Sequence, residues 1–407
     1  MLYSRYRIAS GLRFYFRCLI SILTLEFLHQ RRVPRLEEKL RRFTREENLL
    51  AIPQARVGLY WYLREVLEPG DEVLTSSYTL IDMVNMILCA GGKPVFVDTA
   101  PKHYHLCLED LKKKITPKTK VVVVPHLYGT GAPIEAIVEI CRERGVLVFE
   151  DCAQAVGASH NGKMLGTYGD AGVYSFGALK NVNGIFGGAL VTKDARVLNA
   201  IRETSIACPL MSTGRLFSKL FFCFSYDILT HPWFYTPFAS KIIDLLDESG
   251  HVDKDAVRRT EVPPEYLCQM TSMQASLILD GLKTWKQQAE ASREIADSYT
   301  QALINQTNAI HIPPLPGGGY PTNLQFPVWV EESNLSPKRY LRQQSIDINV
   351  DFFRDVSSLD CFSEYVQECP NTHALLGHLA LLPTYPRQDK PYTELVIRSL
   401  EAFRIDP

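Results

Sequence analysis

The apolar and polar positions of this chain alternate between short hydrophobic runs and stretches with helical spacing. Apolar runs bounded by polar or turn residues predict buried strands; they cover residues 49–52, 72–75, 94–97, 119–125, 146–149, 172–176 and 189–192. Between several of these runs, apolar residues three and four positions apart predict helices, at about 33–43, 57–67 and 79–90. Strands that alternate with helices in this way indicate an α/β fold.

A dense apolar stretch near the N-terminus does not belong to this alternation. Residues 12–32 are rich in aromatic and aliphatic side chains, but Arg13, Arg17 and Glu26 interrupt them. The uninterrupted part is therefore shorter than the ~20 residues of a membrane-spanning helix. A secretory signal is not expected, because no small-residue cleavage site follows. Two interpretations remain open: a helix packed on the protein or a dimer mate, and a helix lying in a membrane interface.

A second aromatic stretch interrupts the pattern at about residues 205–261. Its core contains LFFCFSY and HPWFYTPF, flanked by Lys219 and Lys241. Aromatic runs are normally core, but this one is added to a domain that already has a core. We therefore expect it to expose apolar surface, with residues 233–235 (Trp-Phe-Tyr) as interfacial anchors.

Composition excludes several functional classes. The chain of 407 residues is long enough for two domains. Its 44 basic and 45 acidic residues leave no electrostatic case for a nucleic-acid partner. Ten cysteines occur without CxxC pairs or metal-ligand spacing, which predicts no metal site and favours reduced thiols in a cytoplasmic protein over a disulfide framework.

Candidate chemistry centres on the run at 146–149. This run ends in Glu150 and Asp151, and a small-residue loop after the strand at 172–176 presents Lys180. A strand-end Asp or a loop lysine is by itself common and usually structural or solvated. Together they suit pyridoxal 5′-phosphate (PLP), whose aldehyde forms a Schiff base with lysine and whose ring nitrogen needs a carboxylate partner. His126 would face the same crevice, but we interpret it as a hydrogen-bonded structural residue.

The strings EDCAQAVGA and GTYGDAGVYSF, followed by the lysine and GGALVT, resemble the DegT/StrS family of PLP-dependent aminotransferases. The resemblance runs, with gaps, from about Arg35 to the C-terminus. It implies the type I fold of PLP-dependent transferases, with a large mixed-sheet α/β domain at about 45–275 and a smaller α+β domain at 276–407. Residues 1–44 would then be an N-terminal helical segment, and 205–261 an insertion. The resemblance also implies a homodimer with its active sites at the interface.

The resemblance assigns roles to four residues of the central stretch. Lys180 and Asp151 would be catalytic, as the Schiff-base lysine and the partner of the pyridine nitrogen. Gln154 would lie against the cofactor, and Ser175 would bind its phosphate.

Three departures from the family pattern affect the cofactor contacts. Where the family usually has Ser-Gly-Thr, this chain has about Gln54, Ala55 and Arg56. We expect the helix amides at Ala55, together with Arg56, to hold the phosphate in its place. The usual ring-stacking aromatic is replaced by Leu80, with Tyr78 two residues earlier, so either residue is a candidate. An Asn-Tyr-Arg triplet that normally reaches the partner subunit's phosphate reads Leu-Cys-Gln at 267–269, where Gln269 would be the substitute.

The function implied by the resemblance is transfer of an amino group to a keto-sugar, generally nucleotide-linked. Glutamate would be the donor, and the product would serve cell-surface polysaccharide or amino-sugar biosynthesis. Two alternatives stay open. One is a membrane-surface enzyme acting on a lipid-linked or long-chain ketone, with a peripheral membrane contact. The other is a non-catalytic, PLP-binding regulatory protein, against which the retained lysine argues.

Overall fold

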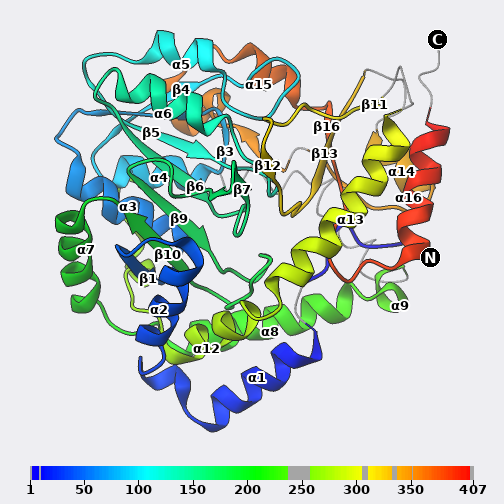
Figure 1. The fold of residues 1–407 in the computed structure, drawn as a ribbon, viewed down its shortest axis with the longest axis horizontal. Coiled ribbons are helices and arrows are strands. Elements are labelled where there is room, and N and C mark those ends of the chain that lie inside the picture. The colour runs from blue at the N-terminus through cyan, green and yellow to red at the C-terminus, as the bar shows by residue number, and fades with distance from the viewer. Residues whose placement is uncertain are drawn as a thin grey trace.

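A seven-stranded mixed sheet lies at the centre of the larger part of the molecule (Figure 1). The structure is a computed structural model, and it describes residues 2–8, 11–236, 257–304, 310–331, 337–350 and 352–403. In spatial order the strands are β1 (Leu49–Ile52), β10 (Gly188–Thr192), β9 (Ala171–Ser175), β6 (Leu147–Cys152), β5 (Thr119–Pro125), β2 (Glu72–Ser76) and β4 (Lys93–Val97). From β9 to β4 the neighbours are parallel, whereas β10 is antiparallel to both β9 and β1. All seven predicted strands are confirmed, with ends shifted by up to three residues.

Helices cover both faces of this sheet, and side chains alternate between the two layers. Leu49 and Ala51 of β1 join the core beneath one layer of helices, while Leu50 and Ile52 join the other. The first layer contains α2 (Val33–Thr44), α5 (Leu108–Lys114), α6 (Ile134–Arg142) and α12 (Ser272–Gly281); the second contains α3 (Ala55–Val66), α4 (Ile81–Cys89) and α7 (Ala195–Ala207). A sheet buried on both faces explains why its strands read as continuous apolar runs.

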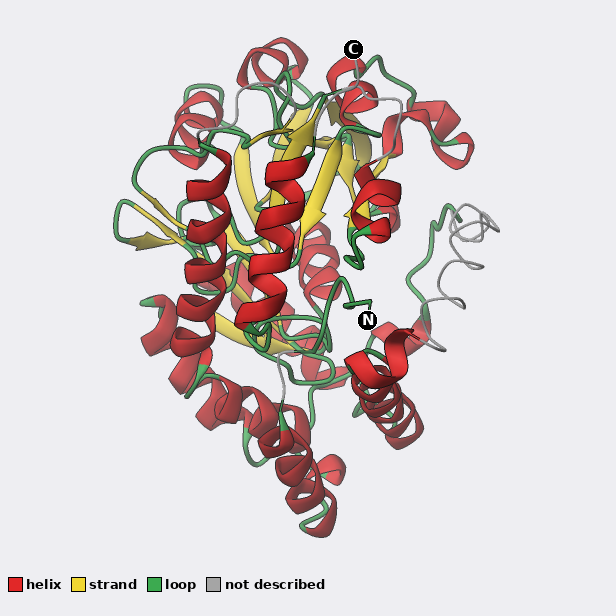
Figure 2. Ribbon diagram, turned by 90° about the vertical axis from the view of Figure 1, so that its right-hand side faces the viewer, coloured by secondary structure: helices red, strands yellow, loops and turns green. Residues whose placement is uncertain are grey.

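A second, smaller core lies around an antiparallel sheet in the C-terminal third (Figure 2). Its strands are β11 (Ile310–His311), β13 (Phe326–Val330), β16 (Leu379–Leu382) and β14 (Asn349–Val350), and its helices are α13 (Trp285–Leu303), α14 (Pro337–Gln343) and α16 (Lys390–Ala402). This arrangement confirms a large α/β part and a smaller α+β part. The domain boundary at residue 275 remains a prediction, and that residue lies inside α12.

Short elements join the two parts. They are β3 (Tyr78–Thr79) with β15 (Arg354–Asp355), the ribbon β12 (Gly319–Tyr320), β7 (Ser159–His160) and β8 (Lys163–Met164), the helix α15 (Pro370–Leu375), and the 3-10 turns η4 (Val356–Ser358) and η5 (Asp360–Tyr365). A further 3-10 turn, η3 (Pro264–Tyr266), packs on the core of the large part. Asp98 sits at one of these junctions, where its carboxylate accepts hydrogen bonds from the backbone of Asn371 and Thr372.

The resemblance to the DegT/StrS family also implies one long connecting helix across residues 263–303, and this prediction is wrong. The chain forms η3, then α12, then a turn, then α13. The turn begins at Gly281, and the N–H groups of Lys283 and Thr284 donate to Asp280 and Gly281 rather than continuing α12. Glycine is the weakest helix former after proline, which makes it a suitable breaking point.

The N-terminal stretch packs on the molecule through one face and leaves the other exposed. Helix α1 (Leu12–Leu23) contacts α12 through Phe14 and Cys18. The opposite face, with helical spacing, exposes Leu12, Phe16, Leu19 and Leu23. Glu26, in the turn η1 (Glu26–Leu28), is buried and accepts hydrogen bonds from Arg17 and Ser21, both at 2.8 Å. Two of the charges that interrupt the apolar run therefore neutralise each other.

The second aromatic stretch forms α8 (Thr213–Leu229) and α9 (Pro232–Phe234), and α8 lies beside α1 (Figure 1). Tyr15 stacks edge-on to Phe224, with ring centroids 5.8 Å apart, and its hydroxyl donates to the Cys223 carbonyl. Large apolar side chains nevertheless remain exposed on α8 and α9: Phe221, Phe222, Phe224, Ile228, Leu229, Trp233 and Phe234. Tyr235 is an exception to the expected anchors, because it is fully buried and donates to Asp347. Lys241 lies outside the described residues.

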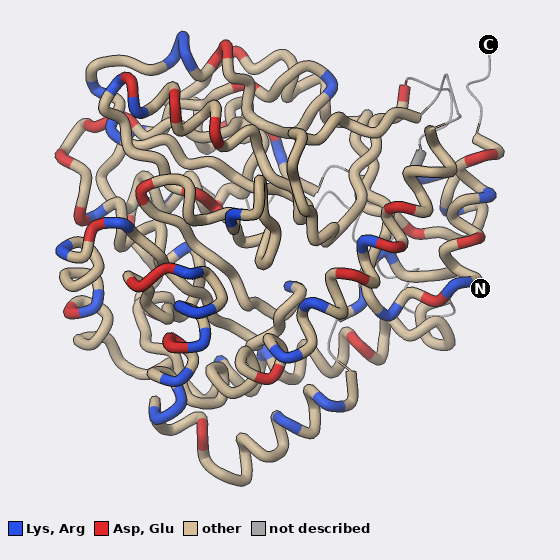
Figure 3. Tube along the Cα trace, in the orientation of Figure 1, with Lys and Arg blue, Asp and Glu red and all other residues tan. Residues whose placement is uncertain are grey.

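The distribution of charge, the length of the helices and the state of the cysteines add three observations. Figure 3 shows acidic and basic positions interspersed along the trace, as the balanced composition predicts. Within the described ranges, none of the helices combines the length and the apolar character needed to cross a bilayer. All ten cysteines are unpaired, and most are buried.

Candidate functional site

A cavity of about 450 Å³ opens at the carboxyl ends of β6 and β9, beside the N-terminus of α3. This is the edge of a parallel sheet where α/β folds bind ligands. Seven of the eight residues predicted for the site line it: Ala55, Arg56, Leu80, Asp151, Gln154, Ser175 and Lys180. They come from separate strands, loops and a helix, so the fold brings them together.

Asp151 and Lys180 face one cavity and influence each other's protonation. Burial raises the pKa of the Asp151 carboxyl, while the Ala153 N–H, 2.9 Å from Oδ1, and the charge of Lys180 lower it. Burial lowers the pKa of Lys180 to about 8; Asp151 opposes that shift and Arg56 adds to it. A large fraction of the Lys180 amine is therefore neutral near pH 8, which is the nucleophilic form.

Hydrogen bonds within the loop that carries Lys180 hold its conformation. The Phe176 N–H donates to Gly187 (2.8 Å), and the Ile185 N–H donates to the Asn183 side chain (2.7 Å). Ile185 has a φ of 70°, a left-handed conformation that is uncommon for a β-branched residue. Backbone strain of this kind is concentrated at functional sites.

Gln154 and Ser175 form part of the wall near this loop. Gln154 Oε1 accepts the Tyr128 N–H at 2.7 Å, which fixes the orientation of its amide. Ser175 is the last residue of β9, and its hydroxyl oxygen is 3.4 Å from the Gly177 nitrogen. Both side chains are placed as their predicted roles require, and those roles stay predictions.

The N-terminus of α3 provides a site for an anion. Gln54 is the N-cap, but its side chain does not cap the helix amides. Its buried Nε2 makes no hydrogen bond to any described residue. Gly188 allows this approach of helix and strand, because a Cβ there would lie 3.0 Å from the Ala55 nitrogen. Arg56 is held nearby by an ion pair with Asp82.

These features fit PLP. The free helix amides and the unpaired Gln54 Nε2 are donors for a phosphate, Asp151 is an acceptor for the ring N–H, and Lys180 is the amine for the aldehyde. Each group faces the same cavity.

Tyr78 is the predicted cofactor residue that the structure places elsewhere. It is 1 % exposed, its hydroxyl is hydrogen-bonded to that of Tyr128 (2.7 Å), and it is not part of the cavity lining. Of the two candidates for stacking on the cofactor ring, the structure places Leu80 and not Tyr78 at the cavity, and the stacking role itself stays a prediction. Leu80, two residues later at the N-cap of α4, is 42 % exposed and lines the cavity. In a continuous strand, residues two positions apart point to the same face. The chain turns between β3 and α4, however, and the sequence does not show which of the two side chains then points into the cavity.

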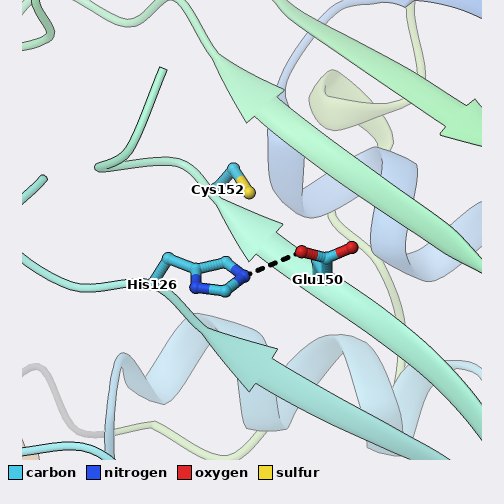
Figure 4. A group of neighbouring side chains, drawn as sticks. All are labelled: His126, Glu150 and Cys152. Carbon is cyan, nitrogen blue, oxygen red and sulfur yellow. Dashed lines mark hydrogen bonds and ion pairs between the residues drawn. The ribbon is translucent and has the colours of Figure 1, made fainter. Parts of the chain in front are cut away.

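His126 belongs to a buried cluster with Glu150 and Cys152, shown in Figure 4. His126 Nδ1 accepts the Ala132 N–H (3.1 Å), so Nε2 carries the proton and donates to Glu150 (3.0 Å). The Glu150 oxygens also accept three backbone N–H groups, those of Gly166, Tyr168 and Gly169. Although these three residue types can bind metals, the histidine and the carboxylate are already satisfied by hydrogen bonds. The interpretation of His126 as structural agrees with this network.

Several cavity residues were not predicted. Arg5 and Tyr6 come from the extended N-terminal segment, Lys219 and Tyr226 from α8, and Asn349 from β14. Tyr6 donates to the carbonyl of Leu179, next to Lys180 (3.0 Å). No local sequence signal identifies these residues, because they reach the cavity only through contacts between segments far apart in the chain.

Comparison with known proteins gives one family and one fold. The model of the DegT/DnrJ/EryC1/StrS aminotransferase family matches residues 23–230 and 233–401. A GDP-perosamine synthase of Vibrio cholerae is 31% identical over 168 residues, which is 41% of this chain and 46% of that protein. A UDP-N-acetyl-3-dehydro-alpha-D-glucosamine 3-aminotransferase of Acidithiobacillus ferrooxidans is 39% identical over 135 residues, 33% of this chain and 37% of that protein. These matches span less than half the length of either relative.

Solved structures match over nearly the whole chain. The sugar aminotransferase CalS13 from Micromonospora echinospora has a TM-score of 0.78 at 20% identity, covering 99% of this chain and 100% of that one. The aminotransferase TlmJ from Streptoalloteichus hindustanus has a TM-score of 0.77 at 22% identity, with coverages of 99% and 98%. At these identities the likeness confirms the type I fold.

Proposed function

The chain belongs to the DegT/DnrJ/EryC1/StrS aminotransferase family, and from that membership and its cavity we propose that it is a PLP-dependent aminotransferase. The amino group would pass from an amino acid, glutamate by resemblance, to a keto-sugar carried on a nucleotide. The names of the two relatives above, both of which refer to nucleotide-linked sugars, support this substrate class. The product would serve polysaccharide or amino-sugar biosynthesis.

One observation carries the proposal: Lys180, with its pKa lowered to about 8, faces the same cavity as a buried Asp151. Nothing in the fold requires a lysine at this position, and burying its amine is unfavourable. A purely regulatory role for bound PLP would not explain that placement.

The residues divide the work of the reaction. PLP, when bound, supplies an electron-accepting ring. Asp151 holds a proton at the ring nitrogen, the N-terminus of α3 binds the phosphate, and Lys180 Nζ accepts and returns a proton beside the substrate carbon. Gln154 and Leu80 line the wall and restrict how a ring can lie.

An amine-transfer assay tests the proposal. The purified chain would be incubated with PLP, glutamate and either nucleotide-linked keto-sugars or long-chain acyl ketones. We expect 2-oxoglutarate and amino sugar in equal amounts, and neither product from Lys180→Ala. Transfer to none of the keto-sugars, or turnover by Lys180→Ala at the wild-type rate, would contradict the assignment. Amination of the acyl ketones alone would instead support the second candidate below.

The second candidate is an aminotransferase that works at a membrane surface on a lipid-linked ketone. The exposed apolar side chains of α1, α8 and α9 favour it, since patches of this kind mark interaction sites. We also propose a cytoplasmic homodimer, for which family membership and the unpaired, mostly buried cysteines are the support.

A further inference from the structure

Helix α8, from the aromatic insertion, supplies part of the wall of the cavity. Lys219 and Tyr226 both line it, together with Asp151. They are seven residues apart, so they lie on one face of the helix. The insertion therefore contributes to the candidate site as well as to the surface.

The other cations of the cavity are compensated by neighbouring groups. Arg56 is paired with Asp82, and its guanidinium lies over the Tyr266 ring at 5.3 Å. Arg5 is paired with the buried Asp347 at 2.8 Å. Lys180 faces Asp151, which raises its pKa.

Lys219 differs from these residues. In the parts of the chain that the structure describes, Lys219 forms no ion pair with a carboxylate; its ammonium lies 3.9 Å from the centre of the Phe222 ring. Burial lowers the pKa of Lys219, Cys223 opposes the shift and Arg56 adds to it. Lys219 and Arg56 both line the cavity.

The residue expected to complete the phosphate contacts is engaged elsewhere. Gln269, which was expected to reach the phosphate in the partner subunit, donates from Nε2 to the carbonyls of Ile206 (3.1 Å) and Cys208 of its own chain. A phosphate monoester needs more positive charge than Arg56 provides, because Asp82 offsets it.

We propose that Lys219, together with Arg56 and the N-terminus of α3, forms a phosphoryl-binding subsite supplied by the same chain. This inference rests on the proposed function, because the phosphoryl group would be that of PLP or the diphosphate of a nucleotide-linked acceptor. Lys219 is a binding residue with the one uncompensated positive charge among the described residues of this cavity.

Paired titrations distinguish the two sources. The full chain, freed of cofactor by dialysis against a carbonyl-trapping amine, would be titrated with PLP and with pyridoxal, which lacks the phosphate. If the group is that of PLP, Lys219→Met should weaken PLP binding about 10- to 100-fold and leave pyridoxal binding unchanged, while Lys219→Arg should stay within a few-fold of wild type. If the phosphoryl group is that of the nucleotide-linked acceptor, the dissociation constants of PLP and pyridoxal should be the same in Lys219→Met and wild type. Binding of UDP to the PLP-loaded protein should then weaken by a similar factor of about 10 to 100.

Controls separate this inference from the proposed function. Lys163→Met removes an exposed lysine on β8, outside the cavity, and should change none of these constants. If Lys219→Met weakens pyridoxal as much as PLP, or changes neither PLP nor UDP binding, the phosphoryl assignment is overturned. A wild-type chain that binds no PLP would contradict the proposed function instead. Stabilisation by inorganic phosphate, lost in Lys219→Met, would then still support the subsite, and equal stabilisation of both proteins would overturn it.

Discussion

At the scale of single residues, the protonation of Lys180 gives a direct pH prediction. Its pKa of about 8 in the folded protein lies below the ~10.4 of an unfolded lysine. Without cofactor, its acylation rate should rise with pH and level off above about 8, whereas the same peptide in denatured protein should keep gaining rate toward pH 10. Peptide mass spectrometry measures both. A folded-state rate that still rises steeply at pH 10 would contradict the assigned environment.

The same shift affects stability with a defined sign. Between pH 8 and about 10.4 the unfolded chain holds the Lys180 proton more tightly than the folded chain. This site therefore destabilises the folded protein fully below pH 8, and that penalty is lost as the pH rises through the window.

Asp151 gives the second prediction at this scale. In Asp151→Asn, the amide cannot hold a proton at the ring nitrogen, so amine transfer should slow by several orders of magnitude. The circular dichroism and unfolding transition should stay close to wild type, because the residue lies at a cavity wall. Single-turnover rates with glutamate measure the effect. Near-normal rates would place the partner of the ring nitrogen on another residue.

Residues next to each other in sequence were the easiest to predict. Asp151, Gln154, Ser175 and Lys180 lie within thirty residues, and the strands β6 and β9 that carry them are adjacent in the sheet. The pair Tyr78 and Leu80 could not be resolved, because a turn at the start of α4 decides which side chain enters the cavity.

At the scale of elements, the crossing of β10 and α3 controls the phosphate end of the cavity. A Cβ on Gly188 would lie 2.7 Å from the Tyr174 carbonyl oxygen and 3.0 Å from the Ala55 nitrogen, both backbone atoms. Gly188→Ala should therefore move α3 away from β10, destabilising the protein by about 1–3 kcal/mol and weakening PLP binding. Urea unfolding and a PLP titration measure the two effects.

Gly214, in the first turn of α8, is the matched control. Nothing lies within 4 Å of a Cβ there, so Gly214→Ala should be neutral or stabilising by about 0.4–1 kcal/mol. Equal stability and PLP affinity for the two variants would contradict the close approach at Gly188.

Elements were predictable where burial alone determines them. The strands of the main sheet are apolar on both faces, so each stands out as a run. The break between α12 and α13 was missed, since a single glycine in a helical pattern is commonly tolerated. At this glycine a Cβ would lie 3.0 Å from Val182 Cγ1, a contact that the sequence does not show.

At the scale of the whole molecule, the sequence predicted the two-part architecture but not how distant segments meet. Residues 2–8 reach the small core, where Tyr3 forms an isolated β-bridge with Ile346, and α8 reaches the cavity. Both contacts join segments that are far apart in sequence and depend on the complete tertiary structure. The amphipathic character of α1 was evident in the sequence, yet which face it buries depends on α12.

The last prediction concerns the exposed apolar face of α1, α8 and α9, which includes Phe16, Leu19, Trp233 and Phe234. Arg13 and Arg17 of α1 are ion-paired with Asp280 and Glu26, so the exposed apolar side chains, with the exposed Arg31 that follows the helix, provide the features typical of interfacial helices. At about 25 cal/mol per Å² of apolar surface, roughly 200 Å² inserted per subunit would contribute about 5 kcal/mol. We therefore expect the protein to sediment with anionic vesicles at low salt.

Trp233→Glu with Phe234→Glu should weaken that sedimentation without removing PLP binding, because neither side chain lines the cavity. Val366→Glu, at an exposed apolar residue outside this face, is the control and should sediment like wild type. The competing explanation is that a second copy covers the face. In that case wild type stays in the supernatant, and the double variant shifts toward monomer in size-exclusion chromatography with light scattering. Lipid insertion and subunit contact would bury the same apolar area. The two explanations are therefore distinguished by sedimentation with vesicles on the one hand and by the oligomeric state without vesicles on the other.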